Sequence, residues 1–453
     1  MKTSPAKTTF TQHEILQLAA DLVSFAQVRG ADEVEVAISQ GEEFNVDIRH
    51  QEIENLTQAQ TWGASVRLFK DNKIASASSS DLRPETMQNL IANALQRLEL
   101  TQEDPWNGLP EATFSFFSPE KLELYDPQIK EIPIEKKIEL ARQTEKIALS
   151  DKRITNSHGA SFSSAELFHA LANSQGFVGS YQETSFSLAV GLQAGETDNR
   201  AEDYWGHSSR VFERLETPEE IARRAVARTV RLLNPRKIST QQVPIVFEPE
   251  MTSWLLGFLF SCVSGTAIYQ QTSFLVGKLG KKIAGSNIEV VDDGLMPGKL
   301  GSRPFDQEGV PCQRTQVINQ GRLDSYLLDT YSARRLKLKS TGNAGGGGVR
   351  PNNFYLLPGS KPPDKFISQL PQGFLLVRTI GHGLNPVTGE ISRGAFGLWI
   401  EKGEIAFPVA EVTISGNLQD VLHQVVFIGQ DLEFRSPICG PTIGVEGLTV
   451  AGN

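Results

Sequence analysis

Residues 34–48 read VEVAISQGEEFNVDI, and apolar side chains alternate with polar ones through much of this stretch. A period of two is typical of a β-strand with one buried face. Working outward, Val66 and Leu68 repeat the alternation, and Asp71-Asn72-Lys73 predicts a hairpin turn before the next strand. These residues therefore predict half-buried antiparallel strands near the N-terminus.

Helical patterns flank these strands and recur farther along the chain. Apolar residues at helical spacing predict helices over 14–26, 84–98 and 134–149. A fourth helix begins at Thr217, because Pro218 suits the first helical position and Glu220 completes a capping box. We predict an α+β unit over 1–100, a linker over 101–120 and a second α+β unit over 121–236.

The third region, 237–453, is rich in glycine and in short strand patterns. Its stretch 251–277 carries no charged residue, but serine, glycine and glutamine interrupt it too often for a membrane span. A buried helix from Met251 to about Tyr269 is the better interpretation. The predicted fold class is α+β, with helix and antiparallel-strand units followed by a β-rich C-terminal domain that contains one buried helix.

Composition excludes several classes of protein. Lys plus Arg is 44 and Asp plus Glu is 53, so the formal net charge is −9, which disfavours binding to nucleic acid. The three cysteines are scattered and odd in number, which excludes a disulfide framework. No secretory signal is visible at the N-terminus. We expect a cytoplasmic protein that contacts neither nucleic acid nor membrane.

No local motif for metal, nucleotide or thiol chemistry is complete in this sequence. His13-Glu14 opens an HExxH pattern, but Gln17 stands where the second histidine is needed. The glycine run 341–348 lacks the Lys-Ser/Thr of a phosphate loop, although its bare backbone could receive an extended peptide. No neighbouring base activates Cys262, Cys312 or Cys439.

The densest cluster of polar and glycine residues spans 381–394. Such composition is first of all turn chemistry. The alternative is a loop that lines a cleft, with hydrogen bonds from His382 and Asn385.

An ordered series of motifs along nearly the whole chain resembles the TldD/PmbA family, which is often labelled "modulator of DNA gyrase". The matching residues are Glu42-Glu43-Phe44 to Trp62-Gly63, Val290-Val291-Asp292-Asp293-Gly294, Gly301-Ser302, Pro304-Phe305-Asp306, Glu308-Gly309, Tyr331-Ser332-Ala333-Arg334, Ser340-Thr341-Gly342-Asn343-Ala344, Ile380 to Gly397, Glu401-Lys402-Gly403-Glu404-Ile405, Pro408-Val409 and Thr413-Ile414-Ser415-Gly416-Asn417.

The resemblance implies a choice between two branches. One branch, like TldD, is a zinc metalloprotease with an HExxxH helix and a later cysteine ligand, and the PmbA/TldE branch lacks that motif and pairs with the first. When this sequence is aligned with the family on the motifs that follow the zinc helix, that helix corresponds to about Leu256–Ser261 of this chain. These residues read LGFLFS. Both histidines and the glutamate are absent, so zinc is expected in the partner and no cofactor in this chain. Cys439, near the C-terminus, is a candidate for the remaining cysteine ligand, but one thiolate does not make a site.

We therefore expect a non-catalytic subunit of a metalloprotease pair that acts on extended or unfolded peptides. No catalytic or metal-binding residue is assigned to this chain. Substrate contacts are predicted, mainly through the main chain, at Asn343, Gly345, His382, Asn385, Thr388 and Gly389. The expected partner is an HExxxH paralogue. Two alternatives remain open: a stand-alone homodimeric peptide-binding or regulatory protein, and a metallopeptidase with a site assembled from dispersed residues.

Overall fold

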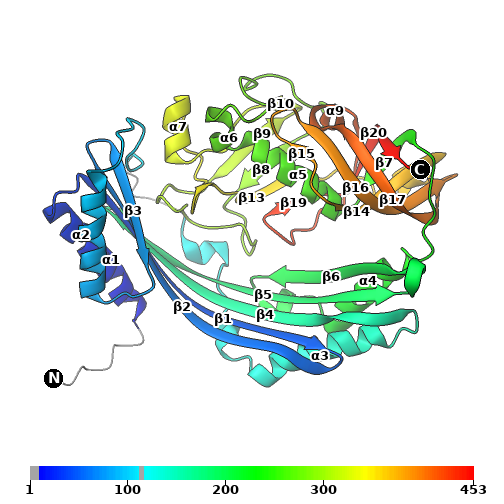
Figure 1. The fold of residues 1–453 in the computed structure, drawn as a ribbon, viewed down its shortest axis with the longest axis horizontal. Helices are drawn as coiled ribbons and strands as arrows, with labels where there is room; N and C mark the ends of the chain where they lie inside the picture. The colour runs from blue at the N-terminus through cyan, green and yellow to red at the C-terminus, as the bar shows by residue number, and fades with distance from the viewer. Residues whose placement is uncertain (1–9, 112–116, 453) are drawn as a thin grey trace.

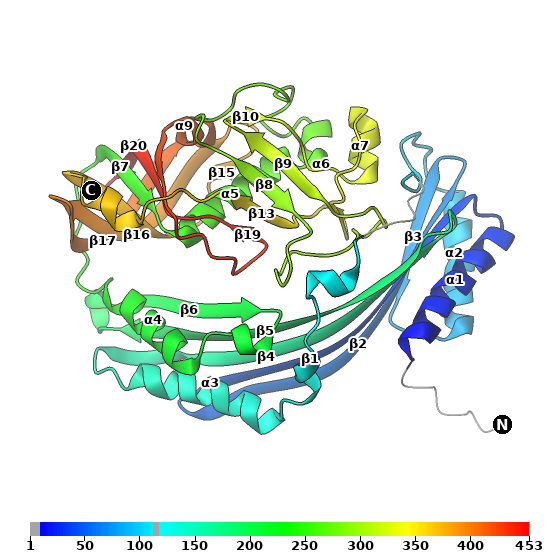
Figure 2. The same ribbon diagram turned by 180° about the vertical axis from the view of Figure 1, so that it is seen from behind.

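The computed structural model describes residues 10–111 and 117–452. A long, curved antiparallel sheet forms one half of the molecule, and a β-rich C-terminal domain lies over the concave face of that sheet (Figure 1). Viewed from behind, the same two halves face each other along the length of the sheet (Figure 2). This arrangement confirms the predicted α+β class with a β-rich C-terminal region.

The curved sheet has the strand order β3-β2-β1-β4-β5-β6. Its central strands β1 and β4 pair without a register shift from Glu35 opposite Asn173 to Ile48 opposite Ala160. The predicted hairpin turn joins β2 and β3, with Asp71 and Asn72 at positive φ. The strands are β1 (Glu33–Arg49), β2 (Glu52–Lys70), β3 (Lys73–Ser79), β4 (Ile154–Asn173), β5 (Val178–Ala194) and β6 (Ala201–Ser209).

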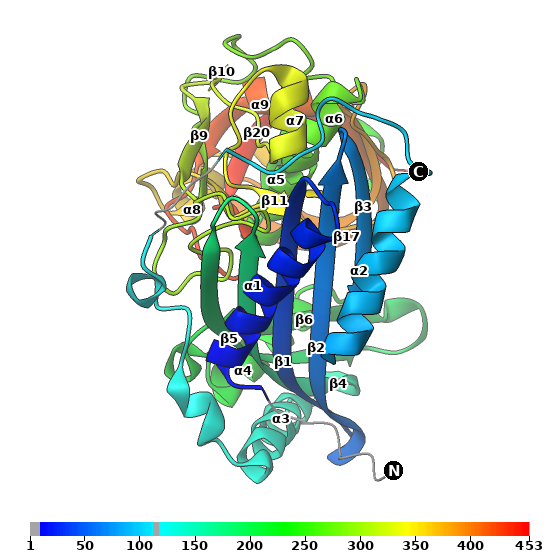
Figure 3. The same cartoon turned by 90° about the vertical axis from the view of Figure 1, so that its left-hand side faces the viewer.

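Four helices cover the convex face of this sheet in two pairs. Helices α1 (Gln12–Val28) and α2 (Pro84–Leu98) lie across one end (Figure 3). Helices α3 (Ile134–Leu149) and α4 (Pro218–Val230) cover the other end. The alternating apolar residues of β1 supply both cores: Val34, Val36 and Ile38 pack under the first pair, and Phe44, Val46 and Ile48 under the second. The predicted capping box at Thr217 is present.

The two N-terminal units share this single sheet, because β1 of the first pairs with β4 of the second. The predicted linker between them contacts the C-terminal domain: Asp104 accepts a 2.7 Å hydrogen bond from the Tyr331 hydroxyl. Leu109 donates its amide to Glu33 over 2.8 Å. Linker residues 112–116 lie outside the described residues. Short 3-10 helices precede α3 at Pro119–Leu122 and Pro127–Lys130, and two more flank β6 at Thr197–Asn199 and Phe212–Arg214.

The C-terminal domain packs two sheets around α5 (Pro249–Val263). The seven-stranded sheet closes on itself, because β14 pairs with both β7 and β16. Its strands are β7 (Gln241–Phe247), β14 (Gln372–Ile380), β15 (Leu384–Asn385), β16 (Glu390–Glu401), β17 (Glu404–Asn417), β18 (Val425–Ile428) and β20 (Ile443–Ala451). The five-stranded sheet contains β8 (Val290–Asp293), β9 (Arg314–Asn319), β10 (Arg322–Leu323), β13 (Asn353–Leu356) and β19 (Ile438–Cys439). The remaining elements are β11 (Ala344–Gly345), β12 (Gly348–Val349), α6 (Gly265–Tyr269), α7 (Thr330–Leu336), α8 (Pro363–Ile367) and α9 (Leu418–His423).

The single helix predicted from Met251 to Tyr269 is wrong in one respect, because it breaks at Ser264. Ser264 adopts an extended conformation between α5 and α6. The backbone of Leu327 runs alongside: its amide donates to Val263 over 3.1 Å, and its carbonyl accepts from Gly265 over 2.7 Å. These tertiary hydrogen bonds replace helical ones at the break. Among the described residues, no helix is long and apolar enough to cross a membrane.

A buried ion cluster joins the curved sheet to the C-terminal domain. Arg67 on β2 forms two hydrogen bonds with Glu35 on β1, at 2.8 and 2.7 Å, and a third with Glu308 of the C-terminal domain at 3.2 Å. The second carboxylate oxygen of Glu308 accepts the amide of Thr330, the first residue of α7, over 2.9 Å. Charge pairing thus fixes the orientation of the two halves at one end of the sheet.

Candidate functional site

The first predicted peptide-binding segment forms a β11–β12 hairpin. Asn343, which precedes it, is fully buried, and its side-chain amide donates to Asp292 at 2.8 Å and to the Arg350 carbonyl at 3.0 Å. Those bonds use both of its amide hydrogens. Gly345 is half-buried and pairs with Gly348 across the hairpin. In this segment, only the backbone of the hairpin remains available to a peptide.

The second predicted segment connects β14 to β16, and its side chains are exposed at His382, Asn385 and Thr388. Asn385 accepts the amide of Val387 over 3.0 Å, which is ordinary turn chemistry. Gly389 is buried at φ +79°, where a Cβ would lie 2.9 Å from the Asn417 side chain. The turn therefore requires this glycine.

The segment 265–274 touches both predicted loops. A Cβ on Gly348 would lie 3.3 Å from the Thr266 hydroxyl, and Phe274 donates its amide to Pro386 over 2.9 Å. The two loops thus border the same stretch of chain. Their role in substrate binding stays a prediction.

Helix α5 occupies the position where the resemblance places a zinc helix. Its residues Leu256, Phe258 and Leu259 are buried in the core of the C-terminal domain. Aliphatic and aromatic side chains offer no lone pair to Zn²⁺. Across residues 10–111 and 117–452, no group of three or more histidine, cysteine, aspartate or glutamate residues is arranged to hold a metal ion. The residues present do not fit a zinc site.

Cys439 lies beside α5. The neighbouring Gly440 donates its amide to Ser253 of α5 over 3.1 Å, and Cys439 pairs with Tyr355 on β13. The thiol itself is buried and donates to the carbonyl of Ser436 at 3.0 Å. The thiol of Cys439 is one potential zinc ligand, and a zinc site requires at least two further protein ligands.

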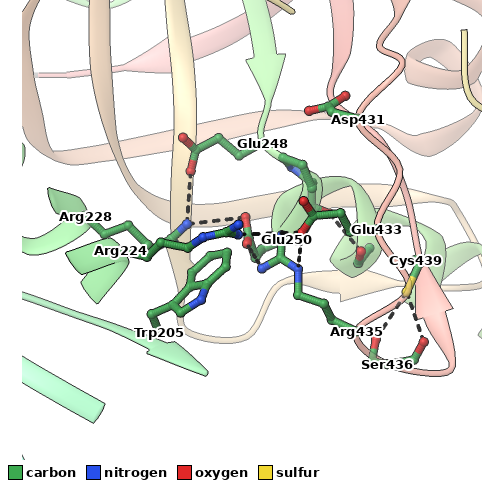
Figure 4. A network of polar contacts seen from close by, with 12 residues as sticks. Trp205, Arg224, Arg228, Glu248, Glu250, Asp431, Glu433, Arg435, Ser436 and Cys439 are labelled. Carbon is green, nitrogen blue, oxygen red and sulfur yellow. Dashed lines mark hydrogen bonds and ion pairs between the residues drawn. The ribbon is translucent and has the colours of Figure 1, made fainter. Parts of the chain in front are cut away.

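Two of the carboxylates drawn in Figure 4, Glu250 and Glu433, are paired with arginines. Arg228 of α4 contacts Asp203 at 3.1 Å and Glu250 at 3.4 Å, and Arg435 contacts Glu250 at 2.9 Å and Glu433 at 3.0 Å. Burial acts to raise the pKa of Glu250, but the two arginines outweigh it and the pKa is lowered. Glu250 is therefore an ionised partner of guanidinium groups.

Trp205 lies at the centre of this arginine cluster. Its ring has the guanidinium carbons of Arg435, Arg224 and Arg228 at 4.1, 5.0 and 5.4 Å from its centroid. The indole N–H donates to Glu216 over 2.9 Å. Cation–π contacts and ion pairs thus join β6 and α4 to α5 and to the loop before β19. The cluster holds the two halves together at the opposite end from Arg67.

A second group of buried carboxylates lies in the matched motifs of the C-terminal domain. Asp292 accepts hydrogen bonds from Asn343 and Asn352, and Asp306 accepts the amides of Glu308, Val310 and Ala344. Burial raises the pKa of Asp292 to about 6 and, with help from Glu308, that of Asp306 to about 7. Through these hydrogen bonds the two aspartates hold the β11–β12 hairpin and the residues beside it in place. Sequence reasoning assigned them no role, although they lie in the motifs that carry the resemblance.

Comparisons with known proteins identify the family of this chain. Models of the PmbA/TldA metallopeptidase match domain 1 at residues 34–97, the central domain at 127–233 and the C-terminal domain at 240–452. The chain is 34% identical over 443 residues to metalloprotease PmbA of Escherichia coli O157:H7, with 97% of each chain covered. It is 34% identical over 444 residues to a PmbA homologue of Haemophilus influenzae, with 98% of this chain and 97% of that protein covered.

Solved structures share the fold. A protein from Bacteroides thetaiotaomicron, described as a modulator of DNA gyrase, superposes with a TM-score of 0.91 at 28% identity, covering 98% of this chain and all of that one. TldE from Thermococcus kodakarensis has the same fold, with a TM-score of 0.84 at 22% identity, covering 96% of this chain and all of that one. The order of the motifs, the three matched domains and the full-length similarity place this chain in the PmbA/TldD family.

Proposed function

We propose that this chain is the zinc-less subunit of a two-subunit metallopeptidase that cleaves extended or unfolded peptides. The partner is an HExxxH member of the same family, which supplies zinc and the metal-activated water. This chain supplies structure and guides the peptide. The pair acts in the cytoplasm, a compartment consistent with the three free cysteines.

The composition of α5 carries the proposal. Leu256, Phe258 and Leu259 are core residues, and the nearby carboxylates Glu250 and Glu433 are held by arginines. Cys439 supplies one sulfur atom, which hydrogen-bonds within its own turn. Because the described residues hold no set of zinc ligands, we place the contribution of this chain to proteolysis in binding the peptide.

The exposed loop between β14 and β16 is where we place peptide contacts. His382 and Asn385 are exposed on the connection between two strands of a closed sheet, and the β11–β12 hairpin offers backbone groups across the segment 265–274. Main-chain pairing with an extended peptide suits loops that are poor in side chains.

Metal content and activity test the proposal together. The chain purified alone, after dialysis without chelator, is expected to contain close to zero zinc by elemental analysis and to leave an unfolded casein substrate intact. Mixed with an HExxxH relative from the same organism, it is expected to increase cleavage of that substrate over the relative alone. One zinc per chain, or chelator-sensitive cleavage by the chain alone, would overturn the proposal.

The loop is tested in the reconstituted pair. His382→Ala with Asn385→Ala is expected to raise KM for the peptide and leave kcat within about twofold, because the loop binds substrate without touching the reacting bond. Lys237→Met, a change at an exposed ion pair, serves as the control. Unchanged KM in the double variant removes the loop from the proposal and leaves the pairing intact.

A further inference from the structure

Arg303, in the C-terminal domain, is a buried cation without a directly paired counter-charge. The residue is 3% exposed, and its Nε and Nη1 atoms are buried and form no hydrogen bond with any described residue. Its Nη2 atom lies 3.5 Å from the carbonyl oxygen of Arg350, at the outer limit for a hydrogen bond. Across residues 10–111 and 117–452, Arg303 forms no ion pair with a carboxylate. A buried charge of this kind is costly unless a partner compensates it.

The acidic groups around Arg303 do not supply that partner. Cys312 and Tyr181 are the acidic side chains with the strongest electrostatic interaction with Arg303. Burial raises the pKa of Cys312 to about 12 and also raises that of Tyr181, so both groups are neutral at pH 7. The carboxylate oxygens of Asp292 and Asp306 accept hydrogen bonds from amide groups and not from Arg303.

Arg350 adds a second unpaired guanidinium group to the same region. It directly follows β12, it is exposed, and it forms no ion pair with a described carboxylate. Partial desolvation, and then the positive charges of Arg303 and Arg210, lower the pKa of Arg350. Arg210 differs from the other two, because it is paired with Glu183 at 2.9 Å. Two of these three cations are therefore uncompensated.

The two unpaired arginines lie at the base of the β11–β12 hairpin, where the C-terminal domain meets the curved sheet. The backbone of Arg350 donates to the Asn343 carbonyl over 2.7 Å and accepts from the Asn343 side chain over 3.0 Å. Tyr181 of β5 interacts electrostatically with both arginines, and its ring centroid lies 5.3 Å from that of Phe305. Among the described residues, none hydrogen-bonds to the Tyr181 hydroxyl. This hydroxyl is thus a neutral donor close to two cations.

We propose that Arg303, Arg350 and Tyr181 form a binding site for a carboxylate of an extended peptide, either its C-terminal carboxylate or an acidic side chain. Guanidinium groups suit this ligand, because their N–H donors match the two oxygens of a carboxylate. Arg350 contacts the carboxylate from the solvent side, Arg303 compensates its charge from the buried side, and Tyr181 donates from the curved sheet. The site rests on the proposed function, because a peptide paired with the hairpin backbone is what brings the carboxylate there.

A binding assay on the chain alone tests the site. The probe is a short, N-terminally labelled peptide of alanine, serine and threonine, prepared with a free C-terminal carboxylate or as the C-terminal amide. Fluorescence anisotropy is expected to show that the free acid binds at least about tenfold more tightly than the amide. A third probe, the amide with a glutamate near its end, identifies the source of the carboxylate. Affinity equal to that of the free acid supports an acidic side chain, and affinity equal to that of the plain amide supports the C-terminus.

Single substitutions connect the preference for the acid to the two arginines. Arg303→Met and Arg350→Met are each expected to bind the free acid as weakly as the amide. Arg350 is exposed, so its variant tests the site even where Arg303→Met weakens folding. Arg303→Lys keeps the charge without the paired donors and is expected to retain part of the preference. Lys237→Met removes a positive charge from an exposed ion pair, and as the control it is expected to keep the full preference.

Equal affinity of the wild-type chain for acid and amide, including no measurable binding of either, would overturn the inference. A preference that survives in both methionine variants would do the same, and so would inorganic phosphate that binds more tightly than the free acid. The assay contains no HExxxH relative, so its result is separate from the zinc and cleavage tests of the proposed function. A chain that fails those tests can still prefer the acid, and a chain that passes them can still lack the preference.

Discussion

Removing the arginine of the buried ion cluster is expected to destabilise the junction between the two halves. In Arg67→Met, Glu35 and Glu308, whose exposures are 4% and 7%, lose the cation that compensates them. Breaking a buried ion pair from one side costs roughly 3–5 kcal/mol. The Arg67 side chain is 29% exposed, so water can partly replace it and we expect about 3 kcal/mol.

Urea unfolding followed by tryptophan fluorescence at pH 7.5 measures this loss. Lys237→Met is the control, because its ion pair with Glu411 is exposed on both sides and is worth at most about 1 kcal/mol. The triple variant with Glu35→Gln and Glu308→Gln is expected to regain most of the stability, since it removes both uncompensated charges.

The pH dependence of Arg67→Met gives a second check. Burial already raises the pKa of Glu35, and Arg67 is the main influence that lowers it. Without Arg67 the folded state takes up protons that the unfolded state does not, so stability is gained as the pH falls. The deficit relative to the wild type is expected to shrink between pH 7.5 and pH 5. A deficit no larger than that of Lys237→Met, or one that is independent of pH, would refute the reasoning.

Two further predictions concern the C-terminal domain. Because the pKa values of Asp292 and Asp306 rise to about 6 and 7, their ionisation disfavours the folded state, and the urea midpoint is expected to fall as pH rises from 5.5 to 7.5. Carboxylates with lowered pKa values, such as Glu183 at about 2, act only below this range, and His207, whose pKa burial lowers, opposes the two aspartates as a single group; a midpoint that rises with pH would contradict the assignment. Gly257→Ala in α5 is expected to stabilise the chain by about 0.5–1 kcal/mol, because its Cβ meets nothing within 4 Å. Gly265→Ala is expected to cost about 1–3 kcal/mol, since its Cβ would lie 2.6 Å from that of Ser332, and equal midpoints for the two variants would argue against this packing.

Local patterns predicted most of the secondary structure. Helices α2 and α3 begin and end at the predicted residues, and the capping box fixes the start of α4. These features depend on residues within four positions of each other. The break at Ser264 was missed because it depends on the backbone of Leu327, which is distant in sequence.

The candidate site was less predictable for the same reason. The absence of zinc ligands at Leu256–Ser261 follows from residue identity, so the sequence suffices. The contact between Arg67 and Glu308 joins residues 241 positions apart, and no local period encodes it. The arginine cluster around Trp205 likewise draws on β6, α4 and the loop before β19.

The pairing of β1 with β4 has a consequence for synthesis of the chain on the ribosome. Val34 donates its amide to Ser174, 140 residues later. At roughly 5–20 residues per second, β1 emerges several seconds or more before its inner neighbour exists. During that interval the β1–β2–β3 meander can fold against α1 and α2, but both of its long edges are open. The nascent chain is therefore most prone to misassociation before β4 is complete, and a chaperone that shields strand edges would act in that interval.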